Sequence, residues 1–178
     1  MSEPNQMSPL ILECRNLWPK IGEGTFLAPN STIIGDVEIG KKCSIWYNVV
    51  IRGDVHSIRI GDETNIQDNT VIHATYQKCG THIARRVSIG HSVILHGCTI
   101  GEGTLIGMGA IIMDLAHIPK HCLVGAGSLV TENQKFEEGW LILGRPAKAI
   151  RPLKPEELKA LEQSADNYLL YKTWYGES

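Results

Sequence analysis

Three histidines, His73, His91 and His96, stand within one short stretch of the chain and are the residues best suited to chemistry. Neutral imidazoles are common ligands of divalent metals, and three of them leave one position of a tetrahedral ion open for water or a substrate. Whether these three side chains can meet depends on the elements that carry them. The other histidines are expected to be surface residues without a special role: His56, His82, His117 and His121.

The composition is that of a soluble globular chain and excludes several function classes. The chain has 178 residues, of which 43% are hydrophobic and 20% charged, and its net charge is -2. It has no basic excess that could follow a phosphate backbone, so we expect no nucleic-acid partner. No apolar stretch approaches the roughly 18 residues that span a bilayer, and the N-terminus lacks a secretory pattern. Five cysteines without CxxC spacing favour a reducing cytoplasm.

An aliphatic residue returns every six positions through most of the chain. Eighteen such residues, each beginning a hexad, are Ile21, Leu27, Ile33, Ile39, Ile45, Ile51, Ile60, Ile66, Ile72, Ile83, Ile89, Leu95, Ile100, Ile106, Ile112, Ile118, Val124 and Val130. A small or β-branched residue follows most of them four positions later. Insertions interrupt the count after Ile51 and at residues 74–82. A period of six is typical of a parallel β-helix, in which three hexads form one triangular coil.

We therefore expect an all-β solenoid of about six coils at residues 21–135, preceded by an N-terminal segment at 1–20. An aromatic content of only 6% fits a narrow interior. Residues 136–178 are expected to form a loop and an α-helix. Pro155 suits the first turn of that helix, and Glu156 and Glu157 lie near its positive end. The apolar positions that follow have helical spacing, so the helix should pack back along the solenoid.

The hexad register places His73 and His96 at the same corner of adjacent coils, with Arg52 one coil below. Neighbouring rungs are about 4.8 Å apart, so the two imidazoles should lie near enough to share one metal. His91 falls on another side of the triangle, above Asp68. Such a side is about 15 Å long, far more than a metal–nitrogen bond. His91 must then come from a neighbouring subunit, which predicts a cyclic oligomer, most simply a three-fold ring with three sites.

These same residues resemble a known family. The runs Ile51-Arg52-Gly53-Asp54, Asn65-Ile66-Gln67-Asp68 and His91 to Cys98 are similar to the gamma-class carbonic anhydrases, above all to their bacterial relatives. The resemblance covers nearly the whole chain. It implies that the parallel β-helix is left-handed and that the protein is a homotrimer. It also implies a metal, zinc with iron or cobalt as alternatives, held by His73 and His96 of one subunit and His91 of the next.

The activity that the resemblance implies is reversible hydration of CO2 to bicarbonate by a hydroxide formed on the metal. Gln67 would orient the hydroxide or the substrate. Arg52 would either hold bicarbonate or pair with Asp54 across the interface, and Asp68 would orient a neighbour or neutralise charge. The full set of expected supporting residues is Arg52, Asp54, Asn65, Gln67, Asp68 and Tyr168.

One departure from the family pattern concerns proton export. Val55 and residues 74–82 offer no carboxylate where the family has acidic residues, so Tyr76, His82 or buffer would have to take the proton. Two other functions stay open. Hexapeptide proteins often act as acyltransferases or acyl-CoA thioesterases, typically with a single histidine as base. A metal-stabilised trimer with an interaction role and little activity is the other alternative.

Overall fold

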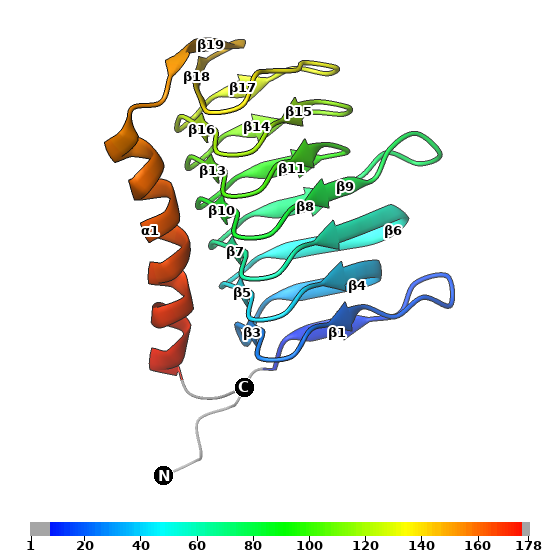
Figure 1. Ribbon diagram of the computed structural model, residues 1–178. Helices are drawn as coiled ribbons and strands as arrows, with labels where there is room; N and C mark the ends of the chain where they lie inside the picture. The colour runs from blue at the N-terminus through cyan, green and yellow to red at the C-terminus, as the bar shows by residue number, and fades with distance from the viewer. Residues whose placement is uncertain (1–7, 176–178) are drawn as a thin grey trace.

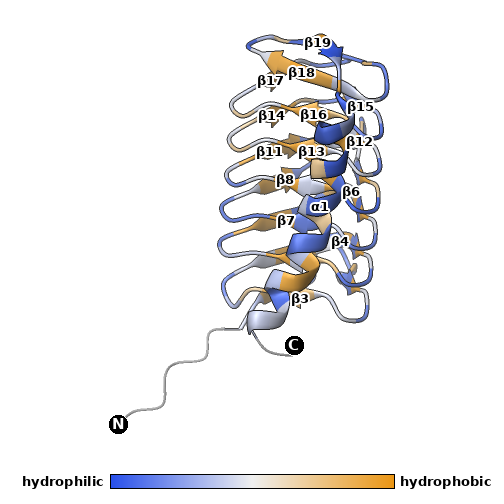
Figure 2. Cartoon of the chain, turned by 60° about the vertical axis from the view of Figure 1, so that its left-hand side comes forward, coloured by the Kyte–Doolittle hydropathy of each residue, from blue (hydrophilic) through white to orange (hydrophobic). Residues whose placement is uncertain are grey.

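The computed structural model describes residues 8–175 and shows a parallel β-solenoid of about seven turns with one helix along its side (Figure 1). Each turn lays one short strand on each of three faces. This is the fold that the hexad period predicts. Hydrophobic residues follow the strands and hydrophilic residues the turns between them (Figure 2).

Three stacks of strands define the faces. The first face carries β1 (Leu10–Leu12), the first halves of β4 (Thr32–Ile39) and β6 (Val50–Ile60), β8 (Val71–His73), β11 (Ile94–His96), β14 (Ile111–Ile112) and β17 (Leu129–Val130). The second face carries β2 (Lys20–Ile21), the second halves of β4 and β6, β9 (Thr81–Ile83), β12 (Thr99–Ile100) and β15 (His117–Ile118). The third face carries β3 (Phe26–Leu27), β5 (Ser44–Ile45), β7 (Asn65–Ile66), β10 (Ser88–Ile89), β13 (Leu105–Ile106), β16 (Leu123–Val124) and β18 (Trp140–Gly144).

The core is a column of aliphatic side chains inside the triangle. The residue that begins a hexad points inward, and Ile33, Ile51 and Leu95 are fully buried examples. The small residue four positions later is buried as well, as Cys43 and Ala110 show. Burying one such aliphatic side chain stabilises the fold by about 1.5–3 kcal/mol, so the repeat itself supplies the stability that fixes the coils.

Both ends of the solenoid extend past the limits that the period indicates. Ile11 of β1 pairs with Ile33, so a strand before residue 21 already belongs to the first face. Ile142 of β18 pairs with Val124, and β18 then pairs antiparallel with β19 (Ala147–Pro152). The period misses these strands because an irregular turn, closed by the bridge between Cys14 and Leu17, separates β1 from β2, and a hairpin follows β18.

Helix α1 (Pro155–Tyr171) continues into the 3-10 helix η1 (Lys172–Tyr175) and runs along the third face from β18 towards β3, as predicted (Figure 1). Leu161 and Ala165 are its buried residues. Among residues 8–175, no helix combines the length and the apolar character that crossing a membrane requires.

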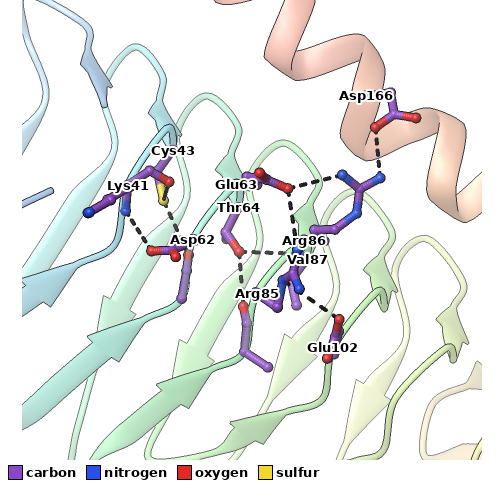
Figure 3. A network of polar contacts seen from close by, with 12 residues as sticks. Lys41, Cys43, Asp62, Glu63, Thr64, Arg85, Arg86, Val87, Glu102 and Asp166 are labelled. Atoms are coloured by element: carbon purple, nitrogen blue, oxygen red, sulfur yellow. Dashed lines mark hydrogen bonds and ion pairs between the residues drawn. The ribbon is translucent and has the colours of Figure 1, made fainter. Parts of the chain in front are cut away.

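Polar contacts fasten the helix to the coils. Arg86 lies between Glu63 and Asp166 of α1, at 3.1 and 2.7 Å (Figure 3). The same corner carries a ladder of such contacts between successive turns, including the carboxylate of Asp62 on the backbone N–H of Lys41 (Figure 3). The helix is therefore held at one position beside the third face.

Candidate metal centre

His73 and His96 lie on adjacent rungs of the first face, at the end of β8 and of β11. The two residues are paired in the parallel ladder, and their ring centroids are 5.1 Å apart, as the register predicts. Nδ1 of His73 and Nε2 of His96 face each other at 3.1 Å. Both side chains are partly shielded from water, with exposed fractions of 17% and 36%.

A carboxylate engages the other nitrogen of each ring. Oδ1 of Asp54 is 3.0 Å from Nε2 of His73, and Oδ1 of Asp114 is 2.6 Å from Nδ1 of His96. A neutral imidazole has a single N–H, which a carboxylate takes as a hydrogen-bond acceptor. The nitrogens that face each other then both present lone pairs, and a cation between them relieves their repulsion.

A metal ion fits this position. With metal–nitrogen bonds of 2.0–2.1 Å, a tetrahedral ion separates two nitrogen ligands by about 3.3 Å, close to the spacing of the facing nitrogens of His73 and His96. Carboxylates behind ligand imidazoles are the usual way in which proteins orient them and raise their basicity. The two histidines of one chain could therefore supply two of the ligands of a divalent metal.

Both carboxylates are held in their charged form. Partial burial alone would raise the pKa of Asp54, but hydrogen bonds with His73 and Arg52 outweigh it and lower that pKa. Burial likewise opposes the charge of Asp114, yet hydrogen bonds from Thr75, His96 and Lys78 hold its pKa well below the ordinary value. Arg52 pairs with Asp54 of its own chain, and the alternatives that it meets an Asp54 across an interface or holds bicarbonate stay predictions.

His91 lies at the opposite edge of the first face, in the turn between β10 and β11. Its Nδ1 is 2.8 Å from Oδ2 of Asp68, the residue one coil below, and 45% of its side chain is exposed. Within residues 8–175, no three His, Cys, Asp or Glu side chains gather closely enough to hold a metal. One chain therefore brings together two of the three predicted histidines and keeps the third apart.

The residues around His91 form a buried polar chain on the third face. The amide of Gln67 donates to Asn65 at 3.1 Å, Asn65 donates to Ser88 at 2.8 Å, and Ser164 of α1 donates to Ser88 at 3.1 Å. Asn65 is only 1% exposed, so its side chain fixes Gln67 instead of lining an open site. Ser88 and Ser164 were not expected from the sequence, because their contact joins segments far apart in the chain.

Tyr168 lies on α1 near Asp68, in a cluster of aromatic rings. Its ring packs edge-on against Trp46 at 5.7 Å and Tyr171 at 5.3 Å. Burial, with the nearby charge of Asp68, raises the pKa of Tyr168 to about 12, so it remains a neutral phenol around pH 7. Tyr168 thus lies near Asp68, the partner of His91, and its part in the site stays a prediction.

Residues 74–82 contact Asp114, the carboxylate behind His96, which the sequence did not indicate. Lys78 contacts both Asp114 and Glu132, and Thr75 donates to Asp114. Tyr76 is 55% exposed, and His82 projects from the second face beside Arg59. The carboxylates near this segment therefore come from other coils and are occupied by Lys78.

The first face between the two edges is apolar. Its outward positions form one column, one residue per turn: Val50, Val71, Ile94, Ile111 and Leu129. Val71 and Ile94 are 39% and 40% exposed. They share their strands with His73 and His96, so the histidine pair, the apolar column and His91 lie in sequence across one face.

Comparison with known proteins identifies the family of the chain. The profile of the bacterial transferase hexapeptide (six repeats) matches residues 19–53. Gamma carbonic anhydrase 2, mitochondrial, of Arabidopsis thaliana is 44% identical over 156 residues, which are 85% of this chain and 56% of the plant protein. Protein YrdA of Escherichia coli K12 is 44% identical over 175 residues, 95% of either chain, and a carbonic anhydrase of Geobacillus kaustophilus is 42% identical over 88% of this chain and 86% of its own.

Solved structures give the same fold. A hexapeptide transferase family protein from Anaplasma phagocytophilum has a TM-score of 0.89 and 44% identity, covering 93% of this chain and 98% of its own. A Bacillus cereus protein described as a candidate acetyltransferase has a TM-score of 0.92 and 42% identity, covering 94% of this chain and 97% of its own. The chain belongs to the gamma carbonic anhydrase family of hexapeptide-repeat proteins.

Proposed function

We propose that this protein is a metal-dependent carbonic anhydrase that interconverts CO2 and bicarbonate at sites between the subunits of a homotrimer. The observation that carries the proposal is the pair His73 and His96, whose facing nitrogens are 3.1 Å apart. His91 lies on the other edge of the same face. Zinc is the proposed metal, with iron and cobalt as alternatives, because sites of three imidazoles accept several divalent ions. Five free thiols agree with a cytoplasmic location.

The apolar first face supports the trimer. Exposed apolar columns of this kind mark association surfaces, and here the column separates two different half-sites. Contact between unlike edges is heterologous, and it closes only in a ring. Three copies that turn their first faces to a common axis bring the His73 and His96 edge of each against the His91 edge of the next. Three equivalent sites result.

The chain's own residues would prepare the substrate. A bound divalent metal acts as a Lewis acid that activates water for addition to CO2 at neutral pH. Gln67 is held by Asn65, so its amide oxygen is free to orient that water or the substrate. Arg52 keeps Asp54 ionised and is itself 43% exposed, so its remaining N–H groups can hold bicarbonate. Asp68 orients His91 through Nδ1.

Proton removal would depend on the solvent. Asp114 and Glu132 are the carboxylates beside residues 74–82, and both contact Lys78. Burial raises the pKa of Tyr168 to about 12, so it stays a neutral phenol near pH 7 and cannot take up the proton. We therefore expect CO2 hydration to accelerate as the concentration of an imidazole buffer rises.

Acyl transfer is the second candidate, because the two solved relatives above are described as a transferase and a candidate acetyltransferase. Fold alone does not decide between the two activities. A histidine with a carboxylate behind it, as His96 has, also suits general-base chemistry. That reading leaves the second histidine and its own carboxylate without a role.

Metal content and two activity assays test the proposal. We expect about one metal ion per subunit in the native protein and in His117→Ala, a control that removes an exposed histidine of β15. His91→Ala and His96→Ala should lose both the metal and CO2 hydration measured by stopped flow. Hydrolysis of a short-chain acyl-CoA is measured in parallel. A native protein that holds no metal after incubation with Zn²⁺ would overturn the proposal.

A further inference from the structure

Both carboxylate oxygens of Asp114, which lies behind His96, have hydrogen-bond partners. Oδ1 lies 2.6 Å from Nδ1 of His96, and Oδ2 accepts hydrogen bonds from Thr75 at 2.6 Å and Lys78 at 3.1 Å. Only 13% of its side chain is exposed. With both oxygens engaged, the carboxylate cannot rotate away from the imidazole without breaking contacts.

Gly97 makes room for this contact. It has a φ of +58°, and a Cβ there would lie 2.7 Å from Oδ1 of Asp114 and 2.5 Å from Sγ of Cys79. Any side chain at this position would therefore push Asp114 away from His96. The residue that follows the histidine is a glycine for a steric reason as well as a conformational one.

We propose that Asp114 is a positioning residue for His96, and that Thr75 and Lys78 hold Asp114 in place. The inference rests on the proposed function, since it concerns His96 as a metal ligand. By accepting the N–H of Nδ1, Asp114 fixes the tautomer in which the lone pair of Nε2 points at His73. Asp54 has the equivalent place behind His73, so each histidine of the pair has a carboxylate of its own.

The insertion at 74–82 supplies the two residues that hold Asp114. Thr75 and Lys78 both belong to this segment, which interrupts the hexad count between Ile72 and Ile83. The insertion thus supplies the donors that keep the Asp114 carboxylate fixed and charged.

Metal affinity is the first test. We expect Asp114→Ala to weaken Co²⁺ binding, measured by competition with a chelator, by about 10–100-fold, the usual effect of losing such a partner. Asp114→Asn keeps an acceptor oxygen but no charge and should lose less. Lys78→Met and Thr75→Val, which free the carboxylate without removing it, should lose least. The absorption spectrum of bound Co²⁺ should change in Asp114→Ala and Asp114→Asn.

Asp62→Ala is the matched control, because Asp62 also bridges two turns but accepts from the backbone of Lys41 and contacts no histidine. It should lose stability to urea while keeping Co²⁺ affinity. If Asp114→Ala and Asp114→Asn weakened Co²⁺ binding no more than this control, the proposal would be wrong.

A metal-free measurement separates this inference from the proposed function. In the apo protein, ¹⁵N NMR should show His96 protonated on Nδ1, and Asp114→Ala should remove that hydrogen-bonded proton. The same His96 signal in both proteins would overturn the inference. A native protein that binds no Co²⁺ would refute the proposed function alone, and the NMR result would still decide the part played by Asp114.

Discussion

The two edges of the first face differ in how much of a metal site each one contains. The first edge carries two imidazoles, His73 and His96, each backed by a carboxylate of the same chain. The second edge carries one imidazole, His91, which is more exposed and has Asp68 as its partner. One edge therefore carries two imidazoles close enough to share an ion, and the other carries a single imidazole.

This difference teaches why such a centre would need assembly. Two ligands from adjacent rungs are fixed by the ladder, whose spacing suits a shared ion. The column that holds His73 and His96 offers no third histidine, so a third imidazole has to come from elsewhere on the surface. In the proposed homotrimer the third ligand comes from a different part of the same surface, so metal binding and subunit association would support each other.

The largest expected effect comes from a substitution that would keep the subunits apart and leave the histidines of both edges unchanged. Ile94→Glu places a charge in the apolar column between them, where an interface would bury it without a partner. We expect monomers in analytical ultracentrifugation and no bound metal. Ile150→Glu is the control, since Ile150 is also exposed, at 53%, but lies on β19. A trimeric, metal-loaded Ile94→Glu variant would contradict the proposed interface.

A smaller effect concerns the supports of the second edge. Asn65→Ala leaves the amide of Gln67 without its buried acceptor and removes one donor from Ser88, which keeps Ser164. It should lower the free energy of unfolding by about 1–3 kcal/mol in urea. Asn30→Ala removes a comparable amide pair with Asn48 in an exposed turn, where water can replace it. Asn30→Ala should lower the free energy of unfolding by much less than Asn65→Ala does. Equal losses in the two variants would show that the polar chain is not buried in solution.

The smallest effect concerns the start of helix α1, which lies along the third face. Hydrogen bonds from Arg151 and from the backbone N–H of Lys154 lower the pKa of Glu157 to about 2 from its ordinary 4.5. Because the folded-state pKa is depressed, the stabilisation is complete above about pH 4.5 and is lost as the pH falls towards 2. Thermal melts of the wild type and Glu157→Gln should therefore differ at pH 6 and converge at acid pH. A constant difference would contradict this assignment.

The sequence predicted the parts of the site that follow the period. His73 and His96 could be placed above each other because both occupy the second position of hexads one coil apart. The same count continues to Ile142, which pairs with Val124, although the hairpin at the end of the chain obscured it. Register arguments therefore succeed wherever the hexads resume in step, as they do after the insertion at 74–82.

The remaining parts depend on contacts without a period. Asp114 comes one residue after the position that lies above His96 on the next coil. Its contact with His96 is therefore diagonal, and comparing equal hexad positions does not reveal it. Thr75 and Lys78 lie in an insertion, where no register applies. The sequence did not reveal the apolar column, because its residues alternate with buried apolar residues and cannot be told from core residues by their type.

Mixed trimers of His91→Ala and His96→Ala give the most direct test of the central claim. Each variant alone should hold almost no metal. When the two are unfolded, mixed in equal amounts and refolded together, a ring that contains both chains joins one intact first edge to one intact second edge. Random assembly should then restore about a quarter of the wild-type metal content per subunit. If the mixture holds no more metal than either variant alone, the site is not shared between subunits and the account is wrong.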